Sequence, residues 1–392
     1  METNAHRIYL DNSATTPVDP GVVDAMLPYF TASFGNASSI HAFGRETKIP
    51  LEESREKIGK AIGAKPGEIF FTSGGTEADN HALLGVAYAA SRAHGKNHLI
   101  VSAIEHHAVI HAAEYLRTNG FDLTVLPVDA SGKIDPDDVG AAITARTSIV
   151  SVIHANNEIG TIQNIKEIAR VAHDHGILLH SDTVQSVGKI PVNVDALSVD
   201  LLAISAHKFY GPKGIGAIYI RKGVDLDSFI HGGAQERNRR AGTENIPLIV
   251  GFAAALELSQ IGLDESLHRF NSLKTELKRL ISEKFDSVIF NGHPVDALPH
   301  IVNVSFDSGK IGIDGEALLL NMDLEGVAVT SGSACSSGSM EPSHVLHAIG
   351  RDTKTARASI RFSMGKYTTR DEIVRAVSVL ESVVRRCVAV PT

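Results

Sequence analysis

The chain has little cysteine and no long apolar segment. Only two cysteines, Cys335 and Cys387, occur in 392 residues, which argues against a disulfide framework and leaves thiol chemistry open. No apolar run approaches the roughly 20 residues that a membrane span requires. Residues 1–7 also lack the apolar core of a signal peptide. A cytoplasmic protein without a membrane segment is therefore expected.

An excess of positive charge is also missing. The chain has 37 lysines and arginines against 45 aspartates and glutamates, a net charge of −8, which gives no electrostatic case for a nucleic-acid partner. Arg237, Arg239 and Arg240 form only a local basic cluster. The hydrophobic content of 43% suffices for a large core, and the length favours two domains over one.

Strand-like apolar runs alternate with helix-length segments. This alternation predicts an α/β fold in which a mostly parallel, seven-stranded sheet is covered by helices on both faces. The last run follows a short turn, so that strand can be antiparallel. The seven runs are Ile69–Thr72, His98–Ser102, Leu123–Pro127, Ser148–Ile153, Ile177–Ser181, Leu201–Ser205 and Gly216–Ile220.

The character of the chain changes after a predicted helix over Ile246–Leu263. A charged amphipathic stretch extends from Asp264 to Lys284, and a further apolar run covers Ile301–Phe306. These features predict a second, smaller unit of mixed α and β structure.

Lys208 stands at the end of a predicted strand. It follows Leu201–Ser205 in the segment Ser-Ala-His-Lys, and open α/β sheets bind their ligands at such ends. A lysine amine in an apolar pocket has a lowered pKa and can form a Schiff base with a carbonyl cofactor, for which pyridoxal phosphate is the obvious candidate. Lys213 is the rival, but it lies in a Pro/Gly turn.

The preceding predicted strand supplies two further candidates. Asp182 lies 26 positions before Lys208, and a carboxylate beside the pyridine nitrogen would keep the ring protonated and electron-withdrawing. Gln185 is placed to reach the phenolic oxygen of the ring. Alternatively, Asp182 simply caps the next helix and Lys208 is an ordinary surface lysine.

A glycine turn precedes a predicted helix at Gly75 and Thr76. Backbone N–H groups at such a turn, with the positive end of the helix dipole, form an anion site suited to the cofactor phosphate. A strand-to-helix turn also needs glycine for steric reasons, and threonine is a common helix cap.

Histidines number 19, so few of them are informative alone. His106 is an exception because it follows a strand-like run and precedes a helical one, and imidazole exchanges protons near neutral pH. His107 is interpreted as structural. His106, His107 and His111 have helical spacing, but no cysteine or acidic cluster completes a zinc ligand set, so no metal is expected.

Cys335 lies in a small, polar segment, Thr-Ser-Gly-Ser-Ala-Cys-Ser-Ser-Gly-Ser. A structural thiol more commonly sits among large apolar residues, whereas a carrier thiol must be exposed to meet both a donor and an acceptor. A mobile, reactive cysteine is therefore predicted here, with an unused loop cysteine as the alternative. Cys387, near the end of a charged helical stretch, is interpreted as a bystander.

Taken together, these segments resemble a cysteine desulfurase of the class V branch of fold-type I pyridoxal phosphate enzymes. The matching stretches occur in family order over nearly the whole chain. They are Tyr9–Pro17, Thr72–Asn80, Glu105–His107, Asn156–Gly160, Ser181–Gln185, Ser205–Lys208, Arg240–Thr243 and Ser331–Cys335.

The resemblance implies a division of the chain and roles for further residues. It implies a large domain over residues 15–263 and a small α+β domain of residues 1–14 and 264–392, with a mobile catalytic-cysteine loop over about 328–342. His106 would stack on the cofactor ring and Asn157 would line its substrate side. Ser205, His207 and Thr243 match phosphate-binding positions. Thr243 would reach across the interface of an obligate homodimer.

The reaction implied is conversion of L-cysteine to L-alanine. Arg361 matches the arginine that grips the substrate carboxylate, a task that suits its planar fork, with Arg357 as a nearby competitor. Cys335 would take the sulfur as a persulfide and pass it to an acceptor such as an iron–sulfur scaffold protein, whose identity stays open. The alternatives are an aminotransferase or selenocysteine lyase on the same fold, or a non-catalytic assembly partner.

Overall fold

A seven-stranded sheet forms the centre of the computed structural model, which describes residues 7–332 and 342–387. The strand order is β2-β8-β7-β6-β5-β3-β4. Only β8 is antiparallel to its neighbours, β7 and β2, as the short turn before it predicted. The strands are β2 (Ile69–Thr72), β3 (His98–Ser102), β4 (Asp122–Leu126), β5 (Thr147–Ser151), β6 (Leu178–Asp182), β7 (Leu201–Ser205) and β8 (Gly216–Ile220).

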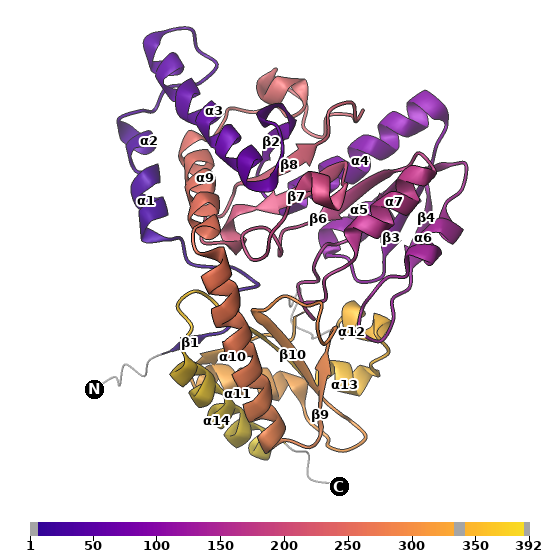
Figure 1. The fold of residues 1–392 in the computed structure, drawn as a ribbon, viewed down its shortest axis with the longest axis vertical. Coiled ribbons are helices and arrows are strands. Elements are labelled where there is room, and N and C mark those ends of the chain that lie inside the picture. The colour runs from indigo at the N-terminus through magenta and orange to yellow at the C-terminus, as the bar shows by residue number, and fades with distance from the viewer. Residues whose placement is uncertain (1–6, 333–341, 388–392) are drawn as a thin grey trace.

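Helices cover both faces of this sheet, as predicted (Figure 1). Alternate side chains of a strand point to opposite faces, so Phe71 packs on one face with α3 (Ala42–Ile62), α7 (Ile165–Asp174) and α9 (Ile246–Gln260). Phe70 packs on the other face with α4 (Gly75–His94) and α5 (His107–Thr118). Double-sided burial explains why these strands read as continuous apolar runs.

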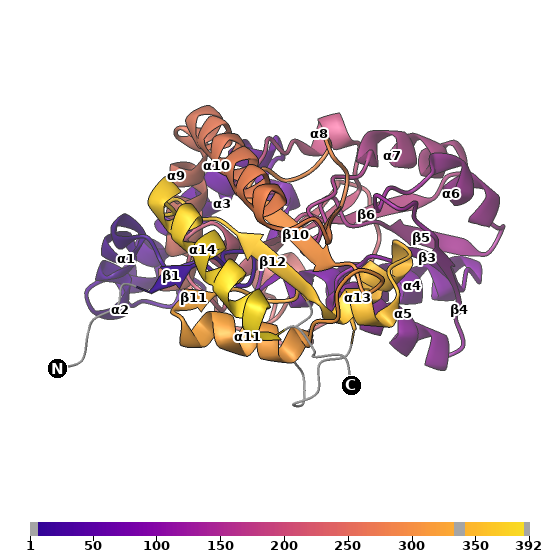
Figure 2. The same cartoon turned by 90° about the horizontal axis from the view of Figure 1, so that it is seen from below.

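A second apolar core lies below the sheet in Figure 1. It is built on a three-stranded antiparallel sheet of β9 (Val288–Asn291), β10 (Ile301–Phe306) and β12 (Ser359–Ser363). Figure 2 views this end, where α10 (Leu263–Lys284), α11 (Gly315–Leu324) and α14 (Arg370–Cys387) surround β10 and β12.

The start of the described chain joins this second core. Its strand β1 (Ile8–Tyr9) pairs in parallel with β11 (Val327–Ala328), and Ile8 is buried there. The predicted domain limits, 15–263 against 1–14 with 264–392, stay a prediction, although the two cores are distinct.

The predicted helix over Ile246–Leu263 ends earlier than expected. The helix α9 stops at Gln260, and α10 begins at Leu263 after Gly262, whose φ of 75° breaks the helical path. Among the described residues no single helix meets the length and apolarity of a membrane span, and only α9 with α10, bent by 71°, does so as a pair.

The remaining elements are short. They are α1 (Pro20–Met26), α2 (Pro28–Thr31), α6 (Pro136–Ala142), α8 (Val194–Leu197), α12 (His344–Ala348), α13 (Thr353–Arg357) and the 3₁₀ turns η1 (Pro66–Glu68), η2 (Ala206–Lys208) and η3 (Gln235–Asn238).

Candidate active site

A cavity of about 480 Å³ opens at the carboxyl ends of β6 and β7. Ligands bind at this edge of open α/β sheets, and the volume lies within the usual range for small-molecule sites. The cavity brings together ten residues that the sequence singled out: Gly75, Thr76, His106, Asn157, Asp182, Gln185, Ser205, His207, Lys208 and Arg361. Their individual roles stay predictions.

One predicted site residue is not in this wall, and another cannot be placed because it lies outside the described residues. Thr243 is exposed and does not line the cavity, which leaves its proposed role in a neighbouring subunit untested. Cys335 lies outside the described residues. Gly332, three positions before it in the sequence, does line the cavity.

The two rival residues lie elsewhere. Lys213 is exposed and lines a separate cavity with Tyr9 and Tyr367. Arg357 is exposed at the end of α13 and does not belong to the wall. The geometry therefore favours Lys208 over Lys213 and Arg361 over Arg357.

The amine of Lys208 is held close to the N-terminal segment. Its Nζ donates to the carbonyl oxygens of Ser13 at 2.7 Å and Ala14 at 2.8 Å. Burial lowers the pKa of Lys208 to about 8, helped by the charge of Arg361 and opposed by Asp182. A lysine with this pKa exposes far more neutral, nucleophilic amine at pH 7 than an ordinary lysine.

Asp182 ends β6 and is only 4% exposed. Its Oδ1 accepts the backbone N–H of Val184 at 2.8 Å. Burial raises the pKa of this carboxyl to about 6, against the lowering effects of that hydrogen bond and of Lys208. The group can thus be an anion at neutral pH when a cationic partner faces it.

Gly75 begins α4 where the helix meets the end of β6. An added Cβ would lie 2.6 Å from Cγ2 of Val184, so a larger residue would push the helix away. The 20-residue helix α4 directs its free N–H groups toward the cavity wall at Gly75 and Thr76. This arrangement suits an anion such as a phosphate.

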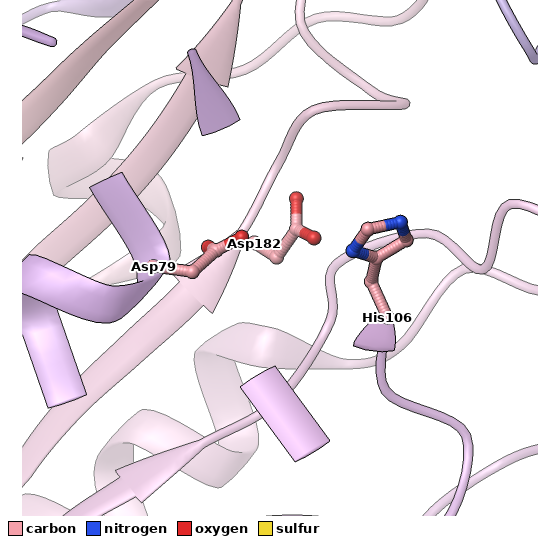
Figure 3. Close-up of side chains that lie close together, drawn as sticks. All are labelled: Asp79, His106 and Asp182. Atoms are coloured by element: carbon pink, nitrogen blue, oxygen red, sulfur yellow. The ribbon is translucent and has the colours of Figure 1, made fainter. Parts of the chain in front are cut away.

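His106 caps the start of α5. Its Nδ1 accepts the backbone N–H of Ala108 at 3.1 Å, so the neutral ring carries its proton on Nε2. Burial, and next the charge of Lys208, lowers the pKa of His106 to about 4. Figure 3 shows the ring facing Asp182. The side chain is therefore neutral at pH 7 and presents an N–H donor.

Arg361 on β12 joins the two parts of the molecule. Its Nη1 donates to the carbonyl oxygen of Asn157 at 2.8 Å, and its Nη2 donates to Oδ1 of Asp11 at 2.7 Å. The side chain is buried, and its Nε has no hydrogen-bond partner among the described residues. Arg361 lines the cavity, so its positive charge would attract an anionic ligand bound there.

Other predicted residues are fixed by the N-terminal segment. The Nε2 of Gln185 donates to the carbonyl oxygen of Ser13 at 2.9 Å. The Nδ1 of His207 lies 3.1 Å from Oγ1 of Thr15. Ser13 and Ala14 thus line the cavity, and Thr15 contacts His207, a use of this segment that its sequence did not reveal.

Sequence reasoning also missed two buried acids, Asp79 and Glu105. Asp79 lines the cavity from α4 and is 1% exposed. Glu105 is fully buried, and its Oε1 accepts the N–H of Ile153 at 2.7 Å and the hydroxyl of Ser102. Burial raises the pKa of Glu105 to about 8. Both residues lie in stretches that match the family, Thr72–Asn80 and Glu105–His107, but only the fold shows that they are near Asp182.

Asp79, His106 and Asp182 place one polar atom each within 4.8 Å of one another (Figure 3). A cation would require Asp79 to be ionised, yet burial and the neighbouring carboxyls of Asp182 and Glu105 all raise its pKa. These three side chains are therefore a poor ligand set for a cation, and the expectation of no metal stays a prediction.

The residues present fit pyridoxal phosphate. The cavity offers a desolvated amine at Lys208, a buried carboxyl at Asp182 and a helix N-terminus at Gly75 on different parts of one wall. These correspond to the groups that a carbonyl, a pyridine nitrogen and a phosphate require.

Comparison with known proteins agrees with this geometry. The family model described as aminotransferase class V matches residues 8–375. A protein named cysteine desulfurase IscS from Dictyoglomus turgidum is 51% identical over 97% of this chain and 95% of its own length. One of the same name from Methanosarcina thermophila is 47% identical over 98% and 94%.

Solved structures show the same likeness. A structure described as a NifS-like protein superposes with a TM-score of 0.90 at 36% identity, covering 97% of this chain and 100% of that one. Another, described as SspA in complex with cysteine, gives 0.80 at 36% identity over 92% and 100%. The chain belongs to the aminotransferase class V family, within its cysteine desulfurase branch.

Proposed function

We infer that this protein is a pyridoxal phosphate-dependent cysteine desulfurase, which converts L-cysteine to L-alanine and transfers the sulfur to Cys335. The observation that carries this inference is the pairing of a desolvated Lys208 amine with the buried carboxyl of Asp182 in one cavity. The names of its relatives favour sulfur transfer over the aminotransferase and selenocysteine lyase alternatives.

The cavity residues would hold the cofactor by its distinct ends. The N-terminus of α4 at Gly75 and Thr76, with Ser205 and His207, would bind the phosphate, and Asp182 would hold a proton at the ring nitrogen. When bound, pyridoxal phosphate supplies a carbonyl to which amines add and a ring that withdraws electrons from the substrate's α-carbon.

Substrate binding follows from the charge of Arg361. We propose that the substrate carboxylate binds this guanidinium, which lines the cavity. Asn157, whose carbonyl already positions Arg361, would contact the same side of the substrate. The α-carbon of a substrate bound in this way would lie in the cavity that Lys208 also lines.

Proton movement would fall to Lys208 and His106. Because its pKa is about 8, the Lys208 amine can take the α-proton as a base and return a proton later. His106, neutral with its N–H on Nε2, would donate a hydrogen bond and assist the proton transfers. Gln185 would orient the ring oxygen.

Sulfur transfer would take place on Cys335. Its thiolate attacks the substrate sulfur, so a sulfur–sulfur bond forms while the carbon–sulfur bond of the substrate breaks. The carbon keeps that electron pair and takes a proton, and L-alanine leaves. The enzyme cysteine then carries a persulfide that a sulfur-acceptor protein, such as an iron–sulfur scaffold, would receive.

We also propose a homodimer and a cytoplasmic location. Large apolar side chains on α1, α2, α3 and their connections remain exposed, which an interface between two copies would cover. They are Leu27, Phe30, Phe34, Ile40, Phe43 and Ile49. Thr243, exposed in one chain, would then reach the phosphate site of the other.

The test is direct. Purified protein should absorb visible light as a pyridoxal phosphate enzyme and release sulfide and alanine in equal amounts from cysteine with a reductant. Borohydride reduction and peptide mapping should place the pyridoxyl label on Lys208. A label on Lys213, or no label on protein saturated with cofactor, would refute the assignment.

The dimer has its own test. Replacing Phe34 with glutamate should shift the mass in solution from two chains to one, because a charge on that apolar surface opposes its burial. A charge on exposed Val295, far from α1–α3 in sequence, is the matched control. A wild-type protein of single-chain mass would contradict the proposal.

A further inference from the structure

Asp79 is a buried acid with one oxygen that lacks a hydrogen bond. It lies on α4 in the cavity wall and is 1% exposed, and its Oδ1 has no hydrogen-bond partner among the described residues. Nε2 of His180 lies 3.5 Å from that oxygen, is also buried, and likewise has no hydrogen-bond partner among the described residues. When two buried polar atoms face each other and neither has a hydrogen bond, one of them is expected to carry a proton that it donates to the other.

The surroundings of Asp79 decide where that proton sits. The titratable groups around it are Asp182 and His180 on β6, Glu105 after β3 and His106 before α5. Burial, and then the charges of Asp182 and Glu105, raise the pKa of Asp79 well above its ordinary value. None of these causes favours the anion.

The contact between His180 and Ser151 is compatible with a protonated Asp79. Its Nδ1 lies 2.8 Å from Oγ of Ser151. If Nδ1 carries the ring proton and donates to Ser151, Nε2 is an acceptor and needs a donor from Asp79. Burial lowers the pKa of His180 to about 3, which disfavours a carboxylate beside a histidine cation. The other neutral tautomer, in which Ser151 donates to Nδ1 and the N–H of Nε2 faces Asp79, would favour an ionised Asp79, and burial with the charges of Asp182 and Glu105 disfavours that anion.

We propose that Asp79 is a positioning residue that keeps its proton, donates it in a hydrogen bond to Nε2 of His180, and leaves Asp182 as the single carboxylate anion behind the cofactor ring. Figure 3 shows Asp79 and Asp182 side by side, with His106 beyond them. This role for Asp79 adds to the proposed function and rests on it, because the ring beside Asp182 is taken to be that of pyridoxal phosphate.

The arrangement explains why an acid occupies this position. Two ionised carboxylates within a few ångström in a dry site repel strongly, and the second would compete with Asp182 for the proton of the ring. An apolar residue would avoid the repulsion but leave His180 without a donor, which costs about as much as burying any unsatisfied polar group. A neutral carboxylic acid avoids both penalties.

Three substitutions separate the possibilities. Asp79→Asn keeps the shape and an N–H donor without charge, whereas Asp79→Leu keeps the volume and has no donor. Asp182→Asn is the positive control. In each variant we would measure the pH midpoint of the visible absorbance of bound pyridoxal phosphate, the dissociation constant of that cofactor, and the infrared carbonyl band of protonated carboxylic acids in the apoprotein at pH 7.

The expected results differ by variant. Asp79→Asn should lose the part of the carboxylic acid band due to Asp79 and keep the wild-type absorbance midpoint, because no charge is removed. Asp79→Leu should bind the cofactor about tenfold more weakly, equivalent to ~1.4 kcal/mol, and shift the midpoint. Asp182→Asn should shift the midpoint strongly.

Two outcomes would overturn the proposal. If Asp79 is ionised, Asp79→Asn leaves the acid band unchanged and lowers the midpoint by about one unit or more. If Asp79 only fills space, Asp79→Leu matches the wild type in midpoint and affinity. The infrared measurement uses apoprotein, so it stands apart from the borohydride label on Lys208 that tests the proposed function.

Discussion

Replacing Arg361 with glutamine should change the reactivity of Lys208. The two side chains need not touch for this, because the guanidinium charge is the largest electrostatic contribution lowering the pKa of the Lys208 amine, after burial. Arg361 also neutralises Asp11 through a 2.7 Å ion pair, and Asp11 raises that pKa. The substitution removes a cation and frees an anion, and both effects favour the protonated amine.

The size of the effect follows from the wild-type pKa of about 8. At pH 7 such an amine is neutral in roughly one molecule in ten, against about one in 3,000 for an ordinary lysine. If Arg361→Gln raises the pKa by about one unit, equivalent to ~1.4 kcal/mol, the neutral fraction at pH 7 falls about tenfold. Above pH 10 the difference should vanish.

The assay is the rate at which apoprotein captures pyridoxal phosphate, followed by absorbance in a stopped-flow instrument from pH 6 to 10. Arg357→Gln is the matched control, because Arg357 is exposed and outside the cavity wall. The prediction is wrong if the pH midpoint of the capture rate in Arg361→Gln equals or lies below that of the wild type, or if Arg357→Gln shifts the midpoint by the same amount.

Four further predictions concern single residues. Asp182→Asn should still bind pyridoxal phosphate but exchange the α-hydrogen of cysteine with solvent deuterium at least a hundredfold more slowly, about 2.7 kcal/mol, and near-normal alanine production would assign the role elsewhere. Cys335→Ser should keep that exchange and yield neither alanine nor persulfide, so sulfide release at the wild-type rate would indicate direct expulsion of sulfide. Glu236→Gln should lower the free energy of unfolding in urea by about 3 to 5 kcal/mol, because Glu236 forms two 2.8 Å contacts with the buried guanidinium of Arg55; a loss under 1 kcal/mol would contradict this. Folding raises the pKa of Glu105 from 4.5 to about 8, so the protonated side chain stabilises the fold fully below pH 4.5 and this stabilisation is lost as the pH rises to about 8. The melting temperature of Glu105→Gln should therefore rise relative to that of the wild type between these pH values. A difference in melting temperature that does not change with pH would refute the shift.

The sheet could be predicted from the sequence because burial on both faces removes the polar alternation of its strands. The predicted run Gly216–Ile220 has the bounds of β8, and Leu201–Ser205 has those of β7. The predicted run Ser148–Ile153 extends two residues past the end of β5, since an apolar run continues into a buried loop beyond the last ladder hydrogen bond. The predicted run Ile177–Ser181 begins and ends one residue before β6, which ends at the polar Asp182.

The cavity could be predicted only in part, for a different reason. Polar residues at strand ends, such as Asp182 and Lys208, can be identified in the sequence because they follow an apolar run. Asp79 gives no such signal, because it lies inside a helix where a polar residue usually faces solvent, and its neighbours on β6 come about 100 positions later. The ion pair of Arg361 with Asp11 spans 350 positions, and no local pattern announces it.

The charge balance of the cavity is what unites these residues. A site for a phosphorylated, carboxylate-bearing reactant must avoid excess negative charge, yet three acids, Asp79, Glu105 and Asp182, are buried in or beside its wall. Burial raises the pKa of each of them, but only Asp182 has a lysine cation acting on it in the opposite direction. At neutral pH Glu105, with its pKa of about 8, and Asp79, as proposed above, would therefore act as neutral hydrogen-bonding groups, and Asp182 alone would stabilise a positive charge on the ring. A lysine cation that acts on one acid alone would thus be enough to select which carboxyl takes part in the chemistry.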